Sequence, residues 1–261
     1  MTETATLSPC AAPAFPVLGV RVHATQIPGA IEQMEQWITL RDSIHYIAVT
    51  GMHGVMEAQQ DIALKEILNS ADLVVPDGMP LVWLGRRKGH GLKRRVYGPE
   101  LMETFCRTTG GKYRHFLYGG VQGVAENLAT VMETRFGNHV AGFYCPPFRP
   151  LTREEETAVE RQIEAATPDI LWVGLSTPKQ EKWMYGMKGR LKVPVMVGVG
   201  AAFDFLTGRS KQAPEWMREN GLEWLYRLVS EPKRLWRRYI LLGSKFVWNV
   251  SLEMLGLKQF N

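Results

Sequence analysis

Short apolar runs alternate with longer amphipathic stretches along most of this chain of 261 residues. The apolar runs have the length and residue types of buried β-strands, and the stretches between them have helical spacing. The expected strands are 44–49, 72–75, 115–118, 140–144, 170–174 and 193–199, and the expected helices are 81–88, 100–107, 121–136, one that begins at Thr152, and 179–188. Strands that alternate with helices of this length form a parallel sheet with helices on both faces. The sequence therefore predicts an α/β fold.

The pattern changes after Phe205. From Pro214 to Leu257 no run resembles a strand, and aromatic and basic residues are interleaved at helical spacing. Residues 207–261 contain 10 Lys or Arg but only 5 Asp or Glu, so this C-terminal segment carries the whole net charge of +5. We expect a helical appendage that favours an acidic partner: nucleic acid, anionic lipid or a phosphate-bearing substrate.

Cysteine content and hydropathy indicate a protein of a reducing compartment that does not span a membrane. The three cysteines have no C-x-x-C spacing, which argues against a disulfide scaffold and a zinc site. No run reaches the roughly 18 apolar residues that a transmembrane helix needs. Residues 1–16 lack a signal-peptide pattern, and we expect them to form a flexible tail before an α/β core at 17–206.

Small and polar residues follow several of the expected strands, and ligands of parallel sheets bind outside the carboxyl ends of the strands. Asp77 comes directly after the strand at 72–75 and lies between Pro76 and Gly78. A carboxylate at this position could act as a general base if partial burial raised its pKa. Alternatively, Asp77 could cap the helix that begins near Pro80, because aspartate is a favoured cap.

Two basic positions are candidates for binding phosphate. Arg95 could grip a diphosphate through its fork of donors, or it could belong to a solvated basic run with its neighbours. Lys179 and the backbone N–H groups after Thr177 could receive a phosphate at a helix start. Ordinary capping of that helix by Thr177 accounts for the same residues equally well.

Three common kinds of site are not indicated. The run V-G-V-G-A-A at 197–202 lacks the third glycine of a dinucleotide fingerprint, and no G-x-x-x-x-G-K-[ST] phosphate loop is present. The histidines show no metal-ligand spacing. There is no Asp-x-Asp pair, so Arg, Lys and backbone donors would have to meet the charge of a phosphate leaving group. We therefore expect neither a cofactor nor a metal.

Six motifs, taken together, resemble the WecG/TagA/CpsF family of bacterial glycosyltransferases. In chain order they are V-T-G at 49–51, A-D-L-V-V-P-D-G-M-P at 71–80, R-V-Y-G-P-E-L-M at 95–102, F-L-Y-G-G at 116–120, G-L-S-T-P-K-Q-E at 174–181 and G-V-G-A-A-F-D at 198–204. The likeness runs from about Val17 to Phe205, and more loosely beyond. Met52 departs from the asparagine of many members, with His53 as its substitute or as a structural residue, and Pro80 replaces a small or aliphatic residue.

The resemblance implies a Rossmann-like core and an inverting, metal-independent glycosyltransferase of cell-surface polysaccharide biosynthesis. Such enzymes move a sugar, N-acetylmannosamine-type or a related hexose, from a UDP-sugar to a polyprenyl-diphosphate-linked sugar. They work in the cytoplasm, peripherally on the inner face of the cell membrane. By motif position Asp77 is the catalytic base, and the expected substrate-binding residues are Thr50, Arg95, Lys179, Gln180, Arg227, Arg234, Arg237 and Arg238. The appendage arginines would close over the site beside an anionic membrane surface.

Two other functions stay open at this point. The basic C-terminal segment could form a nucleic-acid-binding module, but it is the only feature in favour, so we expect no nucleic-acid partner. The chain could also be an inactive scaffold with the family fold in a polysaccharide assembly complex. The joint presence of Asp77, Arg95 and Gln180 argues against that reading. A homo-oligomer and a monomer are both compatible with the sequence.

Overall fold

The computed structural model describes residues 12–260, except for the side chains at positions 215, 219, 234 and 238. The predicted substrate-binding side chains of Arg234 and Arg238 therefore lie outside the described residues, as does most of the predicted N-terminal tail.

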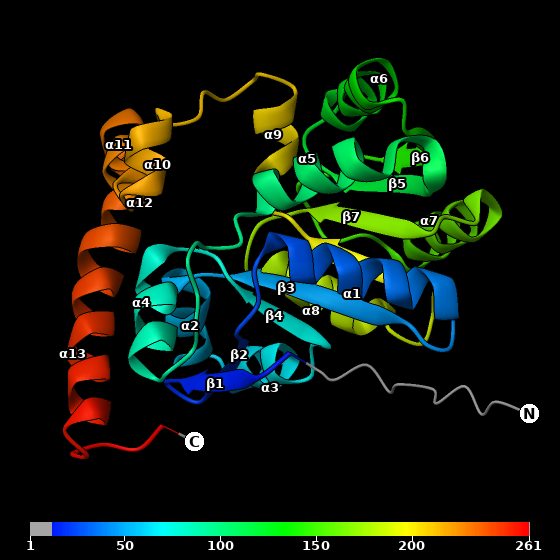
Figure 1. Cartoon of the computed structure of the whole chain (residues 1–261). Coiled ribbons are helices and arrows are strands. Elements are labelled where there is room, and N and C mark those ends of the chain that lie inside the picture. The colour runs from blue at the N-terminus through cyan, green and yellow to red at the C-terminus, as the bar shows by residue number, and fades with distance from the viewer. Residues whose placement is uncertain (1–11, 261) are drawn as a thin grey trace, which may run out of the picture.

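Six strands form one parallel sheet in the order β4-β3-β8-β7-β5-β6 (Figure 1). Their bounds are β3 His45–Thr50, β4 Leu73–Pro76, β5 Arg114–Gly119, β6 His139–Tyr144, β7 Ile170–Gly174 and β8 Val195–Gly198. Each predicted strand is present with small shifts at its ends, so the predicted α/β fold with a parallel, Rossmann-like sheet is confirmed.

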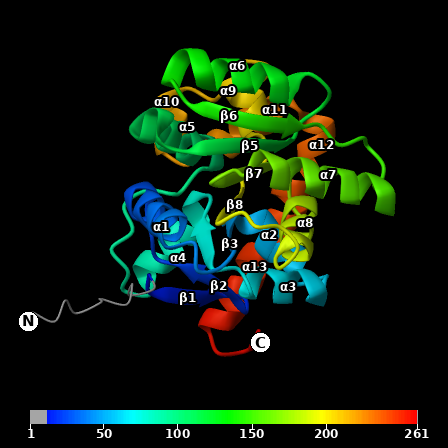
Figure 2. The same cartoon turned by 90° about the vertical axis from the view of Figure 1, so that its right-hand side faces the viewer.

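Helices cover both faces of this sheet (Figure 2). One face carries α1 Ile27–Leu40, α5 Gly98–Thr109, α6 Val124–Phe136 and α9 Ala202–Leu206, and the other carries α2 Met52–Ala58, α3 Ile62–Asn69, α7 Arg153–Ala166 and α8 Lys179–Met187. Successive strand residues point to opposite faces. Tyr46 and Ala48 therefore join one hydrophobic cluster, and Ile47 and Val49 join the other.

Local sequence signals explain where several helices begin. The predicted capping box of α7 is present, because the side chains of Thr152 and Glu155 bind each other's backbone N–H groups. Helix α4, Met79–Arg87, begins slightly earlier than predicted and holds Pro80 in its first turn, where proline costs no hydrogen bond. Helix α6 begins later than predicted because Gly123 has a left-handed conformation, with a φ of 83°.

An N-terminal β-hairpin was not among the predicted elements. It consists of β1 Ala14–Val17 and β2 Val20–His23. Strand β1 begins inside the segment predicted as a tail, so an ordered element starts before residue 17. The backbone N–H of Val74 donates to Nδ1 of His23 at 2.9 Å, which fixes the hairpin beside β4. Strands of four residues, one of them containing Pro16, leave only a weak pattern in the sequence.

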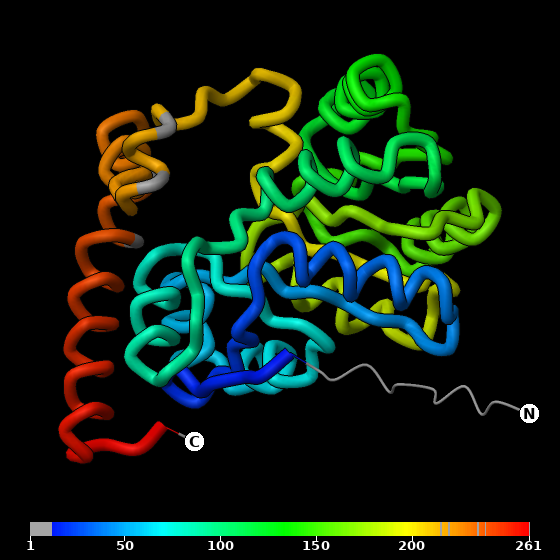
Figure 3. The backbone as a smooth tube through the Cα atoms, in the orientation of Figure 1, coloured from blue at the N-terminus to red at the C-terminus, as the bar shows by residue number. Residues whose placement is uncertain are grey.

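The chain after residue 206 forms the predicted helices, which descend along one side of the molecule (Figure 3). They are α10 Glu215–Glu219, α11 Glu223–Ser230, α12 Pro232–Trp236, a π-helical turn Arg237–Leu241 and α13 Leu242–Met254. Phe246 and Val250 are buried in the same cluster as α2, so the C-terminal segment packs on the α/β body. Within residues 12–260, no helix combines the length and the apolar character that crossing a bilayer requires.

Candidate active site

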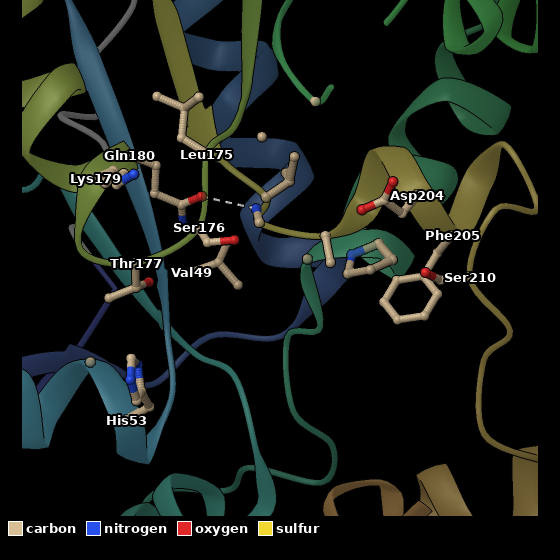
Figure 4. A pocket seen from close by; sticks show the side chains of 18 of the residues that line it. Val49, His53, Leu175, Ser176, Thr177, Lys179, Gln180, Asp204, Phe205 and Ser210 are labelled. Atoms are coloured by element: carbon tan, nitrogen blue, oxygen red, sulfur yellow. Dashed lines mark hydrogen bonds between the residues drawn. The ribbon is translucent and has the colours of Figure 1, made fainter. Parts of the chain in front are cut away.

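A cavity of about 1440 Å³ opens at the carboxyl edge of the sheet. Its wall combines the turns after the strands with part of the C-terminal segment (Figure 4). The turns after the strands lie close together because the strands are parallel and in register. Thr50 pairs with Pro76, and both Ala48 and Val173 pair with Gly198. Five predicted site residues line the cavity: Asp77, Lys179, Gln180, Arg227 and Arg237.

Asp77 is held at this edge by its backbone. Its N–H donates to the carbonyl oxygen of Thr50 at 2.8 Å, which extends the pairing of β3 and β4 by one residue. A side chain at Gly51 would collide with the Asp77 carbonyl oxygen, so the two turns can be this close only with glycine there. The N-cap of α4 is Gly78. Asp77 is therefore not the cap residue of that helix, and it is a half-buried residue of the cavity wall.

Arg95 lies beside Asp77 and is not part of a solvated basic run. The N–H of Val96 donates to the carbonyl oxygen of Pro76 at 2.8 Å, which joins the two segments. The Arg95 side chain is only 15% exposed and forms an ion pair with Glu223 of α11. Burial alone would lower the pKa of the guanidinium, but the carboxylates of Asp77 and Glu223 outweigh it and raise that pKa. Arg95 itself does not line the cavity.

Tyr97 and Arg227 complete this group of charges. The Arg95 guanidinium stacks on the Tyr97 ring, 4.3 Å from its centroid, and Tyr97 lines the cavity. Burial raises the pKa of the Tyr97 hydroxyl, and the Glu223 carboxylate raises it further, so this hydroxyl keeps its proton. Burial alone would lower the pKa of Arg227, but Tyr239, Tyr97 and nearby carboxylates outweigh it. Two acids and two arginines thus meet where the core and the C-terminal segment join.

Gln180 ties the start of α8 to the turn after β8. The N–H of Gly200 donates to Oε1 of Gln180 at 3.0 Å (Figure 4). Nε2 of Gln180 donates to Glu181 at 3.1 Å. The hydroxyl of Thr177 also donates to Glu181, at 2.8 Å. Pro178, not Thr177, is the N-cap of α8, so the capping interpretation of Thr177 is wrong. The fully buried Glu181 instead accepts hydrogen bonds from both Thr177 and Gln180, which line the cavity.

The other predicted residues differ in their access to the cavity. Thr50 is buried and does not line it, and its hydroxyl finds no hydrogen-bond partner among the described residues. Lys179 and Arg237 are exposed side chains on the cavity wall. Within residues 12–260, no group of three or more His, Cys, Asp or Glu residues could hold a metal ion.

Comparison with known proteins adds an independent finding. Residues 15–259 match the model of the glycosyl transferase WecG/TagA/CpsF family. The chain belongs to this family. It is therefore a glycosyltransferase, as the motifs predicted.

Three relatives are enzymes named N-acetylglucosaminyldiphosphoundecaprenol N-acetyl-β-D-mannosaminyltransferase. The chain is 29% identical over 196 residues to that of Bacillus subtilis (strain 168), which is 75% of this chain and 74% of the relative. It is 34% identical over 186 residues to that of Bacillus spizizenii (strain ATCC 23059 / NRRL B-14472 / W23), 70% of each chain. It is 29% identical over 227 residues to that of Staphylococcus aureus (strain MRSA252), 85% of this chain and 86% of the relative.

Met52, the position at which the chain departs from the family pattern, lies against the C-terminal segment. Met52 packs on the core cluster, and a side chain added at Gly243 of α13 would lie 3.7 Å from its terminal methyl group. The neighbouring His53 lines the cavity, and its Nε2 lies 3.4 Å from the Glu57 carboxylate. In this WecG/TagA/CpsF member, the position after Gly51 thus contributes apolar packing, while the histidine faces the cavity.

Three residues of the site were not among the predicted ones. Tyr97 and Glu181 lie inside family motifs, so their motifs offered a signal. Glu223 offered none, because an acid on an amphipathic helix usually faces solvent, whereas this one is 5% exposed.

Proposed function

We propose that this glycosyltransferase moves an N-acetylmannosamine-type sugar from a UDP-sugar to a polyprenyl-diphosphate-linked sugar, with inversion and without a metal ion. The observation that carries the proposal is the cavity that is lined by both Asp77 of the core and Arg227 of the C-terminal segment. A base and a cation at one sheet edge are the groups that glycosyl transfer from a diphosphate needs. The names of the relatives support the donor sugar and the lipid-linked acceptor.

The size of the cavity also supports two large substrates. Its volume of about 1440 Å³ exceeds the roughly 300–1,000 Å³ of sites for single small ligands. A nucleotide sugar and the terminal sugar of a lipid-linked acceptor would both fit.

The proposed reaction is a single in-line displacement. Asp77 accepts the proton of an acceptor hydroxyl as its oxygen attacks the anomeric carbon. The bond from that carbon to the donor diphosphate breaks, and UDP leaves on the opposite face. One carboxylate suffices for inversion, and an α-linked donor would yield the β-linkage that the relatives' names specify. The half-buried position of Asp77 at the cavity wall fits this role.

The charge that develops on UDP needs positive partners. Arg227, Arg237 and Lys179 all line the cavity and come from different elements, so they can surround a diphosphate. Arg95 adds a guanidinium beside Asp77, and its stacking on Tyr97 fixes its plane. These cations support transfer without a metal ion.

A donor and acceptor panel tests the proposed function. Purified protein is incubated with several UDP-sugars and a polyprenyl-diphosphate-linked N-acetylglucosamine analogue, and products are read by mass spectrometry. We expect one added N-acetylhexosamine from UDP-N-acetylmannosamine, with the same rate in the presence of EDTA. Transfer from none of the donors would contradict the reaction class, and loss of activity on chelation would contradict metal independence alone.

We also propose that the C-terminal segment contacts an anionic membrane surface. Its described helices expose large apolar side chains, among them Trp216 and Trp248, which are 60% and 66% exposed. Basic residues interleave with these tryptophans, and this combination suits the interface of an anionic bilayer. A peripheral position there would bring the cavity close to a lipid-linked acceptor.

Replacing Trp216 and Trp248 together with serine is expected to weaken binding to phosphatidylglycerol vesicles by at least about tenfold, because buried aromatic area is lost. Co-sedimentation measures this. The matched control is Leu40→Ser with Ile62→Ser, which removes two exposed apolar side chains from α1 and α3 of the core. Equal binding by both double variants would contradict the proposal. Tighter binding of the parent protein to an oligonucleotide at the same ionic strength would favour a nucleic-acid partner.

A further inference from the structure

The segment between Asp77 and Glu100 is strongly basic. It contains six Lys or Arg residues and no Asp or Glu, although residues 1–206 as a whole have no net charge. Arg95 is only 15% exposed, but the other five are exposed. With an exposed tryptophan they form what we call the α4 basic patch: Trp83, Arg86, Arg87, Lys88, Lys93 and Arg94. None of these six residues lines the cavity, so the active site does not account for their charge.

The loop after α4 is folded back on the helix and held in place. Nε of Arg86 donates to the carbonyl oxygen of Leu92, and Nη2 of Arg86 donates to that of Lys93, both at 2.6 Å. The side chain of Gln26 accepts the N–H of Lys93 at 3.3 Å. A side chain at Gly89 would meet no atom within 4 Å, so the tip of the loop faces open space. The loop backbone is therefore ordered before any partner binds, which lowers the cost of binding.

Three cations of the patch are available to an external anion. The side chains of Arg87, Lys88 and Lys93 make no ion pair or hydrogen bond with any side chain or backbone that the structure describes. By contrast, Arg94 lies 3.7 Å from the Glu100 carboxylate. Like charges this close together repel one another, and a negatively charged partner would relieve that repulsion.

The patch combines its cations with an aromatic ring and borders the C-terminal segment. Trp83 is 53% exposed and shares a face of α4 with Arg87, four residues further on. A side chain at Gly221, just after α10, would lie 3.8 Å from Trp83, and α4 and α10 are neighbours in Figure 1. Exposed tryptophan beside basic residues suits the headgroup region of an anionic bilayer. The patch is therefore next to the surface that carries Trp216, for which a membrane contact is proposed above.

We propose that the α4 basic patch is a second membrane-binding surface, which belongs to the α/β core and binds the anionic headgroups of the bilayer. Arg87, Lys88 and Lys93 bind the lipid phosphates, and Trp83 enters the headgroup region. The patch extends the membrane contact proposed above for the C-terminal segment, and it is independent of the sugar-transfer reaction. Two linked contacts bind more tightly than one, and together they fix the direction in which the cavity faces the bilayer.

Neutralising three cations of the patch tests this proposal. The triple variant Arg87→Gln, Lys88→Gln and Lys93→Gln is compared with the parent by co-sedimentation with phosphatidylglycerol vesicles at about 0.1 M salt. Each cation near an anionic surface strengthens binding roughly fivefold, so we expect the triple variant to bind at least about tenfold more weakly. Arg87→Lys with Lys88→Arg and Lys93→Arg keeps the charge and should bind like the parent. On phosphatidylcholine vesicles, which carry no net charge, all three proteins should bind equally.

The matched control removes the same number of charges from the other side of the core. It combines Arg153→Gln and Arg161→Gln on α7 with Lys192→Gln before β8, and all three side chains are exposed. Figure 1 shows α7 on the opposite side of the molecule from α4 and α13. This control should bind phosphatidylglycerol vesicles within about twofold of the parent, because its cations lie far from the proposed surface.

Three results would overturn the proposal. The first is a triple variant that binds like the parent, and the second is an equal loss of binding by the triple variant and its matched control. The third is tighter binding of the parent to an oligonucleotide than to the vesicles, lost in the triple variant, which would assign the patch to nucleic acid. If only the double variant of Trp216 and Trp248 loses vesicle binding, the contact of the C-terminal segment stands and that of the core is wrong.

The failure of this inference is also distinguishable from failure of the proposed reaction. With a short-chain, water-soluble acceptor, the triple variant should transfer sugar at the parent's rate, because none of its substituted residues lines the cavity. A parent that binds vesicles but transfers no sugar would contradict the reaction alone. A parent that transfers sugar but binds no anionic vesicle would contradict both membrane contacts.

Discussion

Asp77→Asn is expected to lower kcat by roughly 10²- to 10⁴-fold, with little change in the KM for the donor. Asparagine has nearly the same shape, but its amide cannot accept the proton of the acceptor hydroxyl. The turn should keep its place, because the backbone bonds from Asp77 to Thr50 and from Val96 to Pro76 do not involve the substituted side chain. Initial rates with UDP-N-acetylmannosamine and the lipid-diphosphate acceptor give both constants.

The control for this variant is Asp42→Asn, which neutralises an exposed carboxylate in the turn before β3. It should retain full activity. Thermal unfolding of both variants shows whether a loss of rate reflects loss of fold. A folded Asp77→Asn enzyme with kcat within about threefold of the parent would refute the role of Asp77 as the base.

The strands that build the site could be predicted because buried strands of a parallel sheet are continuous apolar runs. The position of Asp77 followed directly, since a polar residue after such a run lies at the carboxyl edge. Its function did not follow, because Asp-Gly-x-Pro is equally typical of a helix start. The structure excludes the cap, because Gly78 is the N-cap of that helix. The role of Asp77 as the base stays a prediction.

The environment of Arg95 could not be predicted from the sequence, since it depends on a tertiary contact between residues that are far apart in the chain. Arg95 stands among several basic residues, and Glu223 stands in an amphipathic helix of a basic segment, so each resembles a solvated surface charge. Their pairing arises from the packing of α11 on the core. The two short strands of the N-terminal hairpin were missed for a related reason, because their order depends on β4 and not on local propensity.

The ion pair of Arg95 and Glu223 is expected to contribute strongly to stability. Arg95→Met is expected to lower the free energy of unfolding by about 3–5 kcal/mol, because Glu223 then stays buried without its cation. Both side chains are shielded from solvent, at 15% and 7% exposure, so solvent screening reduces this cost little. Urea unfolding followed by circular dichroism measures the change. Hydrogen exchange in α11 should also increase, since the ion pair links that helix to the core.

The double variant Arg95→Met with Glu223→Leu provides the decisive comparison. Replacing a buried ion pair by apolar residues of similar volume is often neutral or stabilising. The double variant should therefore recover most of the stability that Arg95→Met loses, although it should remain a poor enzyme because the cation beside Asp77 is lost. If the double variant is as unstable as the single one, or if Arg95→Met costs less than about 1 kcal/mol, the pair does not hold the C-terminal segment on the core.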